Sequence, residues 1–273
     1  MGVDALGYAA LALAAVLIGF SKTAIGGAAT VSIVLFASVL PTRESTGVML
    51  VLLMVGDATA VWTYRRHADW ALIRRLMLPV LVGIVVGAVF LGFAPVALLK
   101  PVIGGIVVVM TLLQAWRRWE AARDARQVRA AGTAPTTPAA SATPVAHPSV
   151  ARSALASALG SAGFGWMAGF TTMVANAGGP VMTLYLLRRD LEVTRFVGTL
   201  AWFFAAVNLT KLPFSIGLGL VRPQRLLLCL ALVPAVLLGA VLGRWLISRI
   251  SKDVFEKVVL VVAGLSCAWL MVS

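Results

Sequence analysis

The chain has 273 residues, of which 60% are hydrophobic and only 12% are charged. Soluble globular proteins are about half apolar and about a quarter charged, so this composition excludes a soluble domain and predicts an integral membrane protein with several spanning helices. The net charge of +13 does not indicate nucleic acid, because the basic residues flank the apolar segments, as they do when charge sets the orientation of a membrane protein. We therefore expect contact with membrane lipid and no nucleic-acid partner.

The apolar segments form two groups on either side of a polar stretch. The groups lie at 5–40, 46–64, 76–99 and 101–116, and then at 153–187, 196–221, 226–248 and 254–272. The stretch between them becomes rich in Pro, Ala, Ser and Thr, a composition that predicts a flexible linker. We expect a first membrane repeat over 1–116, a cytoplasmic linker over 117–150 and a second membrane repeat over 151–273.

The two groups resemble copies of one unit. In each, a glycine pair in the first segment is followed by a single glycine and, ten residues later, by a polar residue in an apolar helix. Each group then contains a proline followed, at intervals of about one helical turn, by two glycines, which we call the Pro-Gly-Gly pattern. We interpret these as packing and hinge positions. Four matches in the same order favour an internal duplication. The matched positions are Gly26-Gly27 with Gly178-Gly179, Gly47 with Gly198, Asp57 with Asn208, and Pro79, Gly83 and Gly87 with Pro234, Gly239 and Gly243.

The distribution of basic residues selects a topology for the two repeats. If the first segment of each half is a hairpin of two half-helices, the halves are inverted, and 16 Lys and Arg residues fall on one side against 6 on the other. Four full crossings in each half give a smaller imbalance, so the positive-inside rule favours the hairpins. The sequence predicts an all-α integral membrane protein with two inverted repeats, each a broken helical hairpin plus three transmembrane helices. Both termini are expected outside.

The first candidate site is the run Ser21 to Gly27, with the sequence SKTAIGG. Lys22 is the only charged residue between 8 and 40, and a cation at the centre of a membrane helix costs about 2.5–3.5 kcal/mol on insertion scales. A helix starting after the glycines would direct unpaired N–H groups at an anion. The alternative is close helix packing at the glycines, with Lys22 reaching out to water. The candidate substrate-binding residues here are Ser21, Lys22, Thr23, Gly26 and Gly27.

The matching run in the second half, ANAGGP, is the second candidate. Pro180 suits the first turn of a helix, and Asn176 can donate to an anion without carrying charge. Inversion would bring the two helix starts together in the middle of the membrane. Helix packing is again the alternative. This run adds Asn176, Gly178 and Gly179 to the expected substrate site.

The third candidate is the pair Asp57 and Asn208, with Lys211 one turn beyond. Burial disfavours the charged form of a carboxylate, so Asp57 is a candidate proton carrier. It is equally a candidate for a structural role, either in an ion pair with Lys22 or in a hydrogen bond to the backbone of a broken helix. Asn208 is expected to contact the substrate. Lys211 is included in the site, although its position near a helix end favours snorkelling to water.

No enzyme signature competes with these sites. The sequence contains no HExxH, GxSxG or Walker A motif, and Cys229 and Cys267 lie in apolar segments without a Cys/His cluster. We therefore expect no catalysis, no cofactor and no metal site.

Four stretches resemble the sulfite exporter TauE/SafE family. They are GFSKTAIGG, AGFTTMVANAGGPVMTLYLL, RFVGTLAWFFAAVNLTK and LVPAVLLGAVLGRWL, and the resemblance extends over nearly the whole chain. It implies a bacterial inner-membrane transporter of small sulfur-containing or organic anions such as sulfite, sulfonates or sulfoacetate. Lys22 differs from the looser, more apolar motif of many members.

Our interpretation is a secondary transporter that exports such an anion, with proton coupling through Asp57. The leading alternative is a cation or metal transporter, which would need more buried carboxylates or thiols than Asp57 supplies. The other alternative is a non-transporting membrane scaffold whose linker binds a partner. The sequence leaves a homo-oligomer open.

Overall fold

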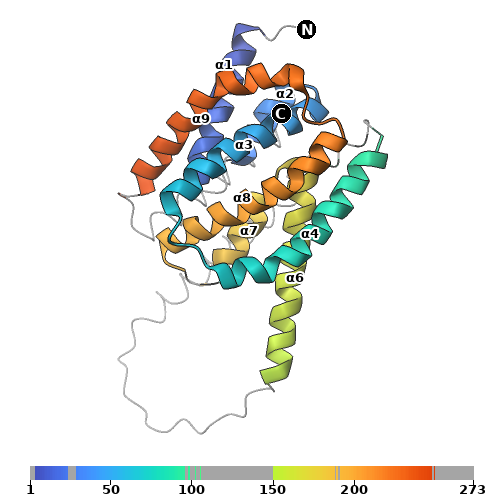
Figure 1. Cartoon of the computed structure of the whole chain (residues 1–273), viewed down its shortest axis with the longest axis vertical. Helices are drawn as coiled ribbons and strands as arrows, with labels where there is room; N and C mark the ends of the chain where they lie inside the picture. Colours follow the sequence, from blue (N-terminus) through green and yellow to red (C-terminus); the bar gives the residue numbers. More distant parts are fainter. Residues whose placement is uncertain are drawn as a thin grey trace, which may run out of the picture.

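In the computed structural model of the chain, the described residues are 4–23, 29–95, 150–187 and 191–247, with the single residues 98, 102, 105, 189 and 249. Every secondary-structure element within these ranges is helical (Figure 1). Gly26, Gly27, most of the predicted linker, most of the segment at 101–116 and the segment at 254–272 lie outside them. The helices are α1 (Ala5–Thr23), α2 (Ala29–Val39), α3 (Thr42–Tyr64), α4 (Trp70–Phe93), α6 (Val150–Ala175), α7 (Gly178–Leu187), α8 (Val193–Gly217), the 3-10 helix η1 (Pro223–Arg225) and α9 (Leu226–Ile247).

Five of the described helical segments are long and apolar enough to cross a membrane: α1, α3, α4, α8 and η1–α9. A crossing takes about 20 residues, whereas α2 has 11 and α7 has 10. Large apolar side chains such as Phe93 and Leu227 are exposed, as expected where a surface faces lipid. The predicted all-helical, multi-pass membrane class is confirmed.

The first apolar segment of each half forms two helices that fold back on each other. In the first half, the Ser32 hydroxyl of α2 donates to the Ala14 carbonyl of α1 at 2.9 Å. In the second half, the hydroxyls of Ser161 in α6 and Tyr185 in α7 lie 2.9 Å apart. Each segment therefore folds back on itself as expected. The arms are not the two half-helices of the prediction, however, because α1 and α6 have 19 and 26 residues, against 11 and 10 in α2 and α7.

Helices α3 and α8 pack side by side in opposite directions (Figure 1). Gly47, near the start of α3, lies against the backbone of Leu220, which follows α8. Gly198, near the start of α8, lies against the backbone of His67, which follows α3. The matched glycines thus make matched contacts at opposite ends of the pair.

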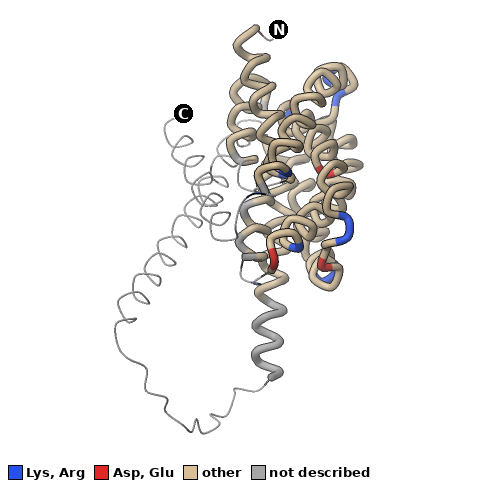
Figure 2. Tube along the Cα trace, turned by 90° about the vertical axis from the view of Figure 1, so that its left-hand side faces the viewer, with Lys and Arg blue, Asp and Glu red and all other residues tan. Residues whose placement is uncertain are grey.

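Ion pairs tie both ends of this helix pair. Glu44 at the start of α3 pairs with Arg222 at 2.9 Å and Arg225 at 2.7 Å. Arg195 at the start of α8 pairs with Asp69 at 3.2 Å. Figure 2 shows most of the charged residues toward the two ends of the described helices, with few between. The polar ends and apolar middle are those of a membrane-spanning bundle.

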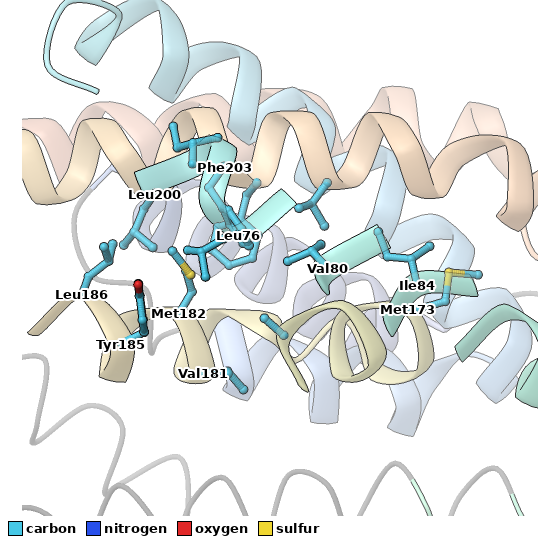
Figure 3. Packing of buried hydrophobic residues seen from close by; sticks show 14 of the residues in the cluster. Leu76, Val80, Ile84, Met173, Val181, Met182, Tyr185, Leu186, Leu200 and Phe203 are labelled. Atoms are coloured by element: carbon cyan, nitrogen blue, oxygen red, sulfur yellow. The ribbon is translucent and has the colours of Figure 1, made fainter. Parts of the chain in front are cut away.

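The core is divided into two clusters, and each cluster contains helices from both halves of the chain. Helix α1 packs most extensively on α9, and α4 packs most extensively on α6. One cluster is built mainly from α1, α2, α3 and α9. The other is built mainly from α4, α6, α7 and α8 (Figure 3). Each hairpin is therefore packed against a helix from the other half.

Glycines let these crossing helices touch through their backbones. A Cβ atom added at Gly83 of α4 would lie 2.2 Å from the Trp166 carbonyl oxygen of α6. One added at Gly239 of α9 would lie 2.0 Å from the Val16 carbonyl oxygen of α1. Small residues at such crossings are how membrane helices gain van der Waals contact. The matched glycines of the Pro-Gly-Gly pattern are packing positions in both halves.

Gly83→Ala should destabilise the protein, because the new methyl group forces two backbones apart, and overpacking of this kind costs about 1–3 kcal/mol. Gly163→Ala is the matched control: Gly163 is also helical, but a Cβ there meets open space. Thermal unfolding in detergent should give a lower midpoint for Gly83→Ala and an unchanged or higher one for Gly163→Ala. Equal midpoints for the two variants would contradict the close-contact interpretation.

Candidate functional site

The matched polar residues of the two halves meet in the centre of the bundle. Asp57 lies about midway along α3 and Asn208 lies in the matching position of α8. Both are buried, and the Asn208 amide donates to Asp57 Oδ2 at 2.6 Å. Since α3 and α8 run in opposite directions, matched residues can meet only near the centre of the pair.

Lys22, near the end of α1, points into this centre. Its Nζ lies 2.6 Å from Asp57 Oδ1, and the two side chains are only 9% and 3% exposed. Nζ also lies 4.6 Å from the centroid of the Phe204 ring. The lack of a side chain at Gly56 gives the lysine room, since a Cβ there would lie 3.0 Å from Lys22 Cγ. The sequence left open whether Lys22 pairs with Asp57 or reaches out to water. In the structure it pairs with Asp57 and does not reach out to water.

Lys211 is buried too, with an exposed fraction of 0%. Its Nζ donates to the Thr172 carbonyl at 2.7 Å and to Asn176 Oδ1. The expectation that Lys211 snorkels to water is wrong. The reason is that α8 continues to Gly217, which places Lys211 well inside the helix.

Asn176 forms the break between α6 and α7. Its φ angle of 54° is left-handed, a conformation that Asn tolerates better than most residues. Its N–H donates to the Thr172 carbonyl at 3.0 Å, which caps α6, and its Nδ2 donates to the Thr46 carbonyl of α3 at 3.1 Å. Contacts from α3 and α8 therefore hold the break in place.

The glycine pair of the second half lies just past this break, as the first two residues of α7. The expected interruption at the glycines is displaced by two residues, because Asn176 supplies the left-handed turn. Gly178 has a packing role, since a Cβ there would lie 2.9 Å from Thr172 Cβ. Gly179 instead lines a cavity.

That cavity lies beside the ion pair, is partly open to its surroundings and has a volume of about 30 Å³. Residues of both halves line it. They are Ser21, Lys22, Ala29, Leu53, Thr172, Asn176, Gly179, Leu200, Ala201, Phe204 and Asn208. The cavity thus brings together five of the predicted substrate-binding residues: Ser21, Lys22, Asn176, Gly179 and Asn208.

Other predicted residues lie next to the cavity without lining it. Asp57 is behind Lys22 and Asn208, and Lys211 is behind Asn176. Thr23 has a different placement: its hydroxyl donates to the Ala240 carbonyl at 2.8 Å, so it ties α1 to α9. Ser21 lines the cavity, but its hydroxyl donates to the Ile18 carbonyl of its own helix at 3.1 Å.

Sequence reasoning missed the remaining lining residues, of which Thr172 and Phe204 carry the most contacts with the site. Helical spacing could have found both, since Thr172 is four residues before Asn176 and Phe204 is four residues before Asn208. Neither type stands out in an apolar helix, where aromatic and hydroxyl residues are common. Within the described ranges there is no group of three His, Cys, Asp or Glu residues that could hold a metal ion.

Comparison with known families fits this arrangement. The family model described as "Sulfite exporter TauE/SafE" matches residues 11–270. The chain belongs to the TauE/SafE family. No match was found among the curated proteins or among the solved structures. As a TauE/SafE protein with several membrane-capable helices, the chain is a multi-pass membrane transporter of the anion-transporting kind that this family implies.

Breaking the Lys22–Asp57 pair from one side should destabilise the protein by about 3–5 kcal/mol, because a buried charge loses its partner. We expect Lys22→Gln and Asp57→Asn each to lower the unfolding midpoint in detergent. The double variant Lys22→Gln/Asp57→Asn should recover much of the loss, because it leaves neither charge alone. A double variant with the summed loss of the two single variants would mean that the residues do not interact.

Proposed function

We propose that this TauE/SafE protein exports a small sulfur-containing or organic anion, of the sulfite, sulfonate or sulfoacetate type, across the bacterial inner membrane. The observation that supports this most directly is the Lys22 ammonium in the wall of the cavity between the two halves. Asp57 holds the ammonium in position. An ammonium has three N–H donors, so its contact with Asp57 leaves others for a ligand.

The start of α7 adds a second source of positive potential. The first N–H groups of a helix have no partner within the helix and carry the positive end of its dipole. Gly179 is in this first turn and lines the cavity, so a ligand can approach the backbone without meeting a side chain. Gly26 and Gly27, which lie outside the described residues, remain the proposed counterpart of Gly178 and Gly179 in the other half.

We further propose that the two halves are inverted repeats that rock against each other to alternate access. Three features support this: the opposed directions of α3 and α8, the matched contacts of Gly47 and Gly198, and the meeting of Asp57 with Asn208. The exchange of helices between the two cores is also what a twofold relation of the halves requires.

The charges disfavour the alternative of a cation transporter. Asp57 is the only buried carboxylate among the described residues, and Lys22 already neutralises it. Lys211 adds a second buried amine nearby. A cation entering this cavity would meet the Lys22 ammonium and, among the described residues, no free carboxylate. Of the two roles open to Asp57, these contacts favour the ion pair that positions Lys22.

Lys22→Ala should abolish or strongly reduce sulfite and sulfonate transport in proteoliposomes. The loss of one charged contact corresponds to at least about tenfold in affinity. Lys22→Gln/Asp57→Asn separates this effect from misfolding, since it should fold and yet fail to transport. Arg66→Gln, which changes an exposed basic residue in the turn after α3, is the control and should transport normally. Unchanged anion transport by Lys22→Ala would remove Lys22 from the site.

A further inference from the structure

We infer that Lys211 is the proton site of this transporter, and that it takes up a proton when a monovalent anion enters the cavity. The inference rests on the proposed function. It concerns a group whose surroundings differ sharply from those of the other two buried charged residues. Lys22 and Asp57 compensate each other in a direct ion pair. Lys211 has no such partner within the described part of the chain.

The contacts of Lys211 fit a neutral amine in the empty site. A neutral amine has two N–H donors and an ammonium has three. The two acceptors of Lys211, the Thr172 carbonyl and Asn176 Oδ1, are both uncharged. They satisfy both donors of the neutral form and leave one donor of the charged form without a described acceptor.

The neighbours of the Lys211 amine place it close to any ligand in the cavity. Both residues that hold Lys211 Nζ, Thr172 and Asn176, line the cavity. An ammonium enclosed without a counter-charge is costly, and the cost is relieved either by release of the proton or by a nearby anion. A proton on Lys211 and an anion in the cavity therefore favour each other, and the linkage is reciprocal.

The other charged groups around Lys211 do not supply the counter-charge that its ammonium form needs. The helices packed on α8 include α1, α3, α4 and α7, and Lys211 itself contacts α6 through Thr172. Among their described titratable residues, Lys22 of α1 and Asp57 of α3 are the groups that act on Lys211. Because these two form a neutral pair, Lys211 is left as the uncompensated charge. The Arg74 and Arg75 side chains of α4 are exposed, and the Tyr185 hydroxyl of α7 contacts Ser161 and Arg189 instead.

Asp57 is a poorer proton site for the same reason. Its two oxygens are engaged by Lys22 and by Asn208. A proton on Asp57 would leave the Lys22 ammonium buried without its counter-charge, which is strongly unfavourable. The inference thus moves the proton-carrying role from Asp57 to Lys211.

The test is the number of protons taken up when purified protein binds methanesulfonate, a monovalent anion that does not titrate near neutral pH. Calorimetry in two buffers with different ionisation enthalpies gives this number between pH 6 and pH 9. We expect uptake that approaches one proton for each anion as the pH rises. Over the same range the affinity should fall by up to about tenfold for each pH unit, because the neutral amine must first be protonated.

Two substitutions locate the proton. Lys211→Arg keeps a permanent positive charge, so it should bind methanesulfonate without proton uptake and without pH dependence. Lys211→Met should bind at least about tenfold more weakly than the wild type at pH 6. Its binding should show no proton uptake and no pH dependence, so the difference from the wild type should narrow as the pH rises. Arg66→Gln should match the wild type. Unfolding midpoints recorded beside these measurements show which variants fold, and the wild-type measurement does not depend on any variant.

The outcomes separate this inference from the proposed function. Methanesulfonate binding by the wild type without proton uptake would overturn the role of Lys211 and leave anion binding intact. Proton uptake that persists in Lys211→Arg would also overturn it, and would return the role to Asp57. Failure of the wild type to bind methanesulfonate, sulfite or sulfoacetate would overturn both proposals.

Discussion

The structure depends on how charge is accommodated in the middle of an apolar bundle. A cation there must find a counter-charge or neutral acceptors, because lipid offers neither. Lys22 finds Asp57, and Asp57 in turn holds Asn208. This chain of contacts joins α1, α3 and α8 at the point where the halves meet. It therefore fixes the relative positions of the helices and keeps an ammonium at the wall of the cavity.

The second lysine illustrates a different solution. Lys211 lies against two neutral oxygens at the break between α6 and α7. One contact is with a backbone carbonyl and the other is with Asn176, which also contacts Thr46 of α3. The break is thus restrained from both central helices. A change of charge at Lys211 would alter its hydrogen bonds to Thr172 and Asn176, which form the turn between α6 and α7. Binding of a proton and an anion could in this way move the hairpin.

Cross-packing between the halves gives this site its rigidity. Each hairpin rests on a helix of the other half through backbone contacts at glycine, as at Gly83 and Gly239. Small residues at these crossings leave no flexible side chain between the two backbones. The ion pairs of Glu44 and Asp69 then link the ends of α3 and α8 to the opposite loops. Rocking of the two halves against each other would have to rearrange both these polar ends and the glycine contacts, because both join one half to the other.

The sequence by itself determined the membrane class, the folding back of the first segment in each half, and the presence of Lys22, Asp57 and Asn208 as polar residues within apolar helices. These follow from length, apolar patterning and the rarity of polar groups in lipid, which are local properties of the chain. Only the tertiary structure decided which charges pair, because Lys22 and Asp57 are brought together by helix packing. It also placed the turn at Asn176 instead of the glycines, assigned Thr23 to a helix contact, and buried Lys211. Each of these outcomes depends on a neighbour distant in the sequence, such as Thr46, Ala240 or Thr172, and no pattern along the chain specifies that neighbour.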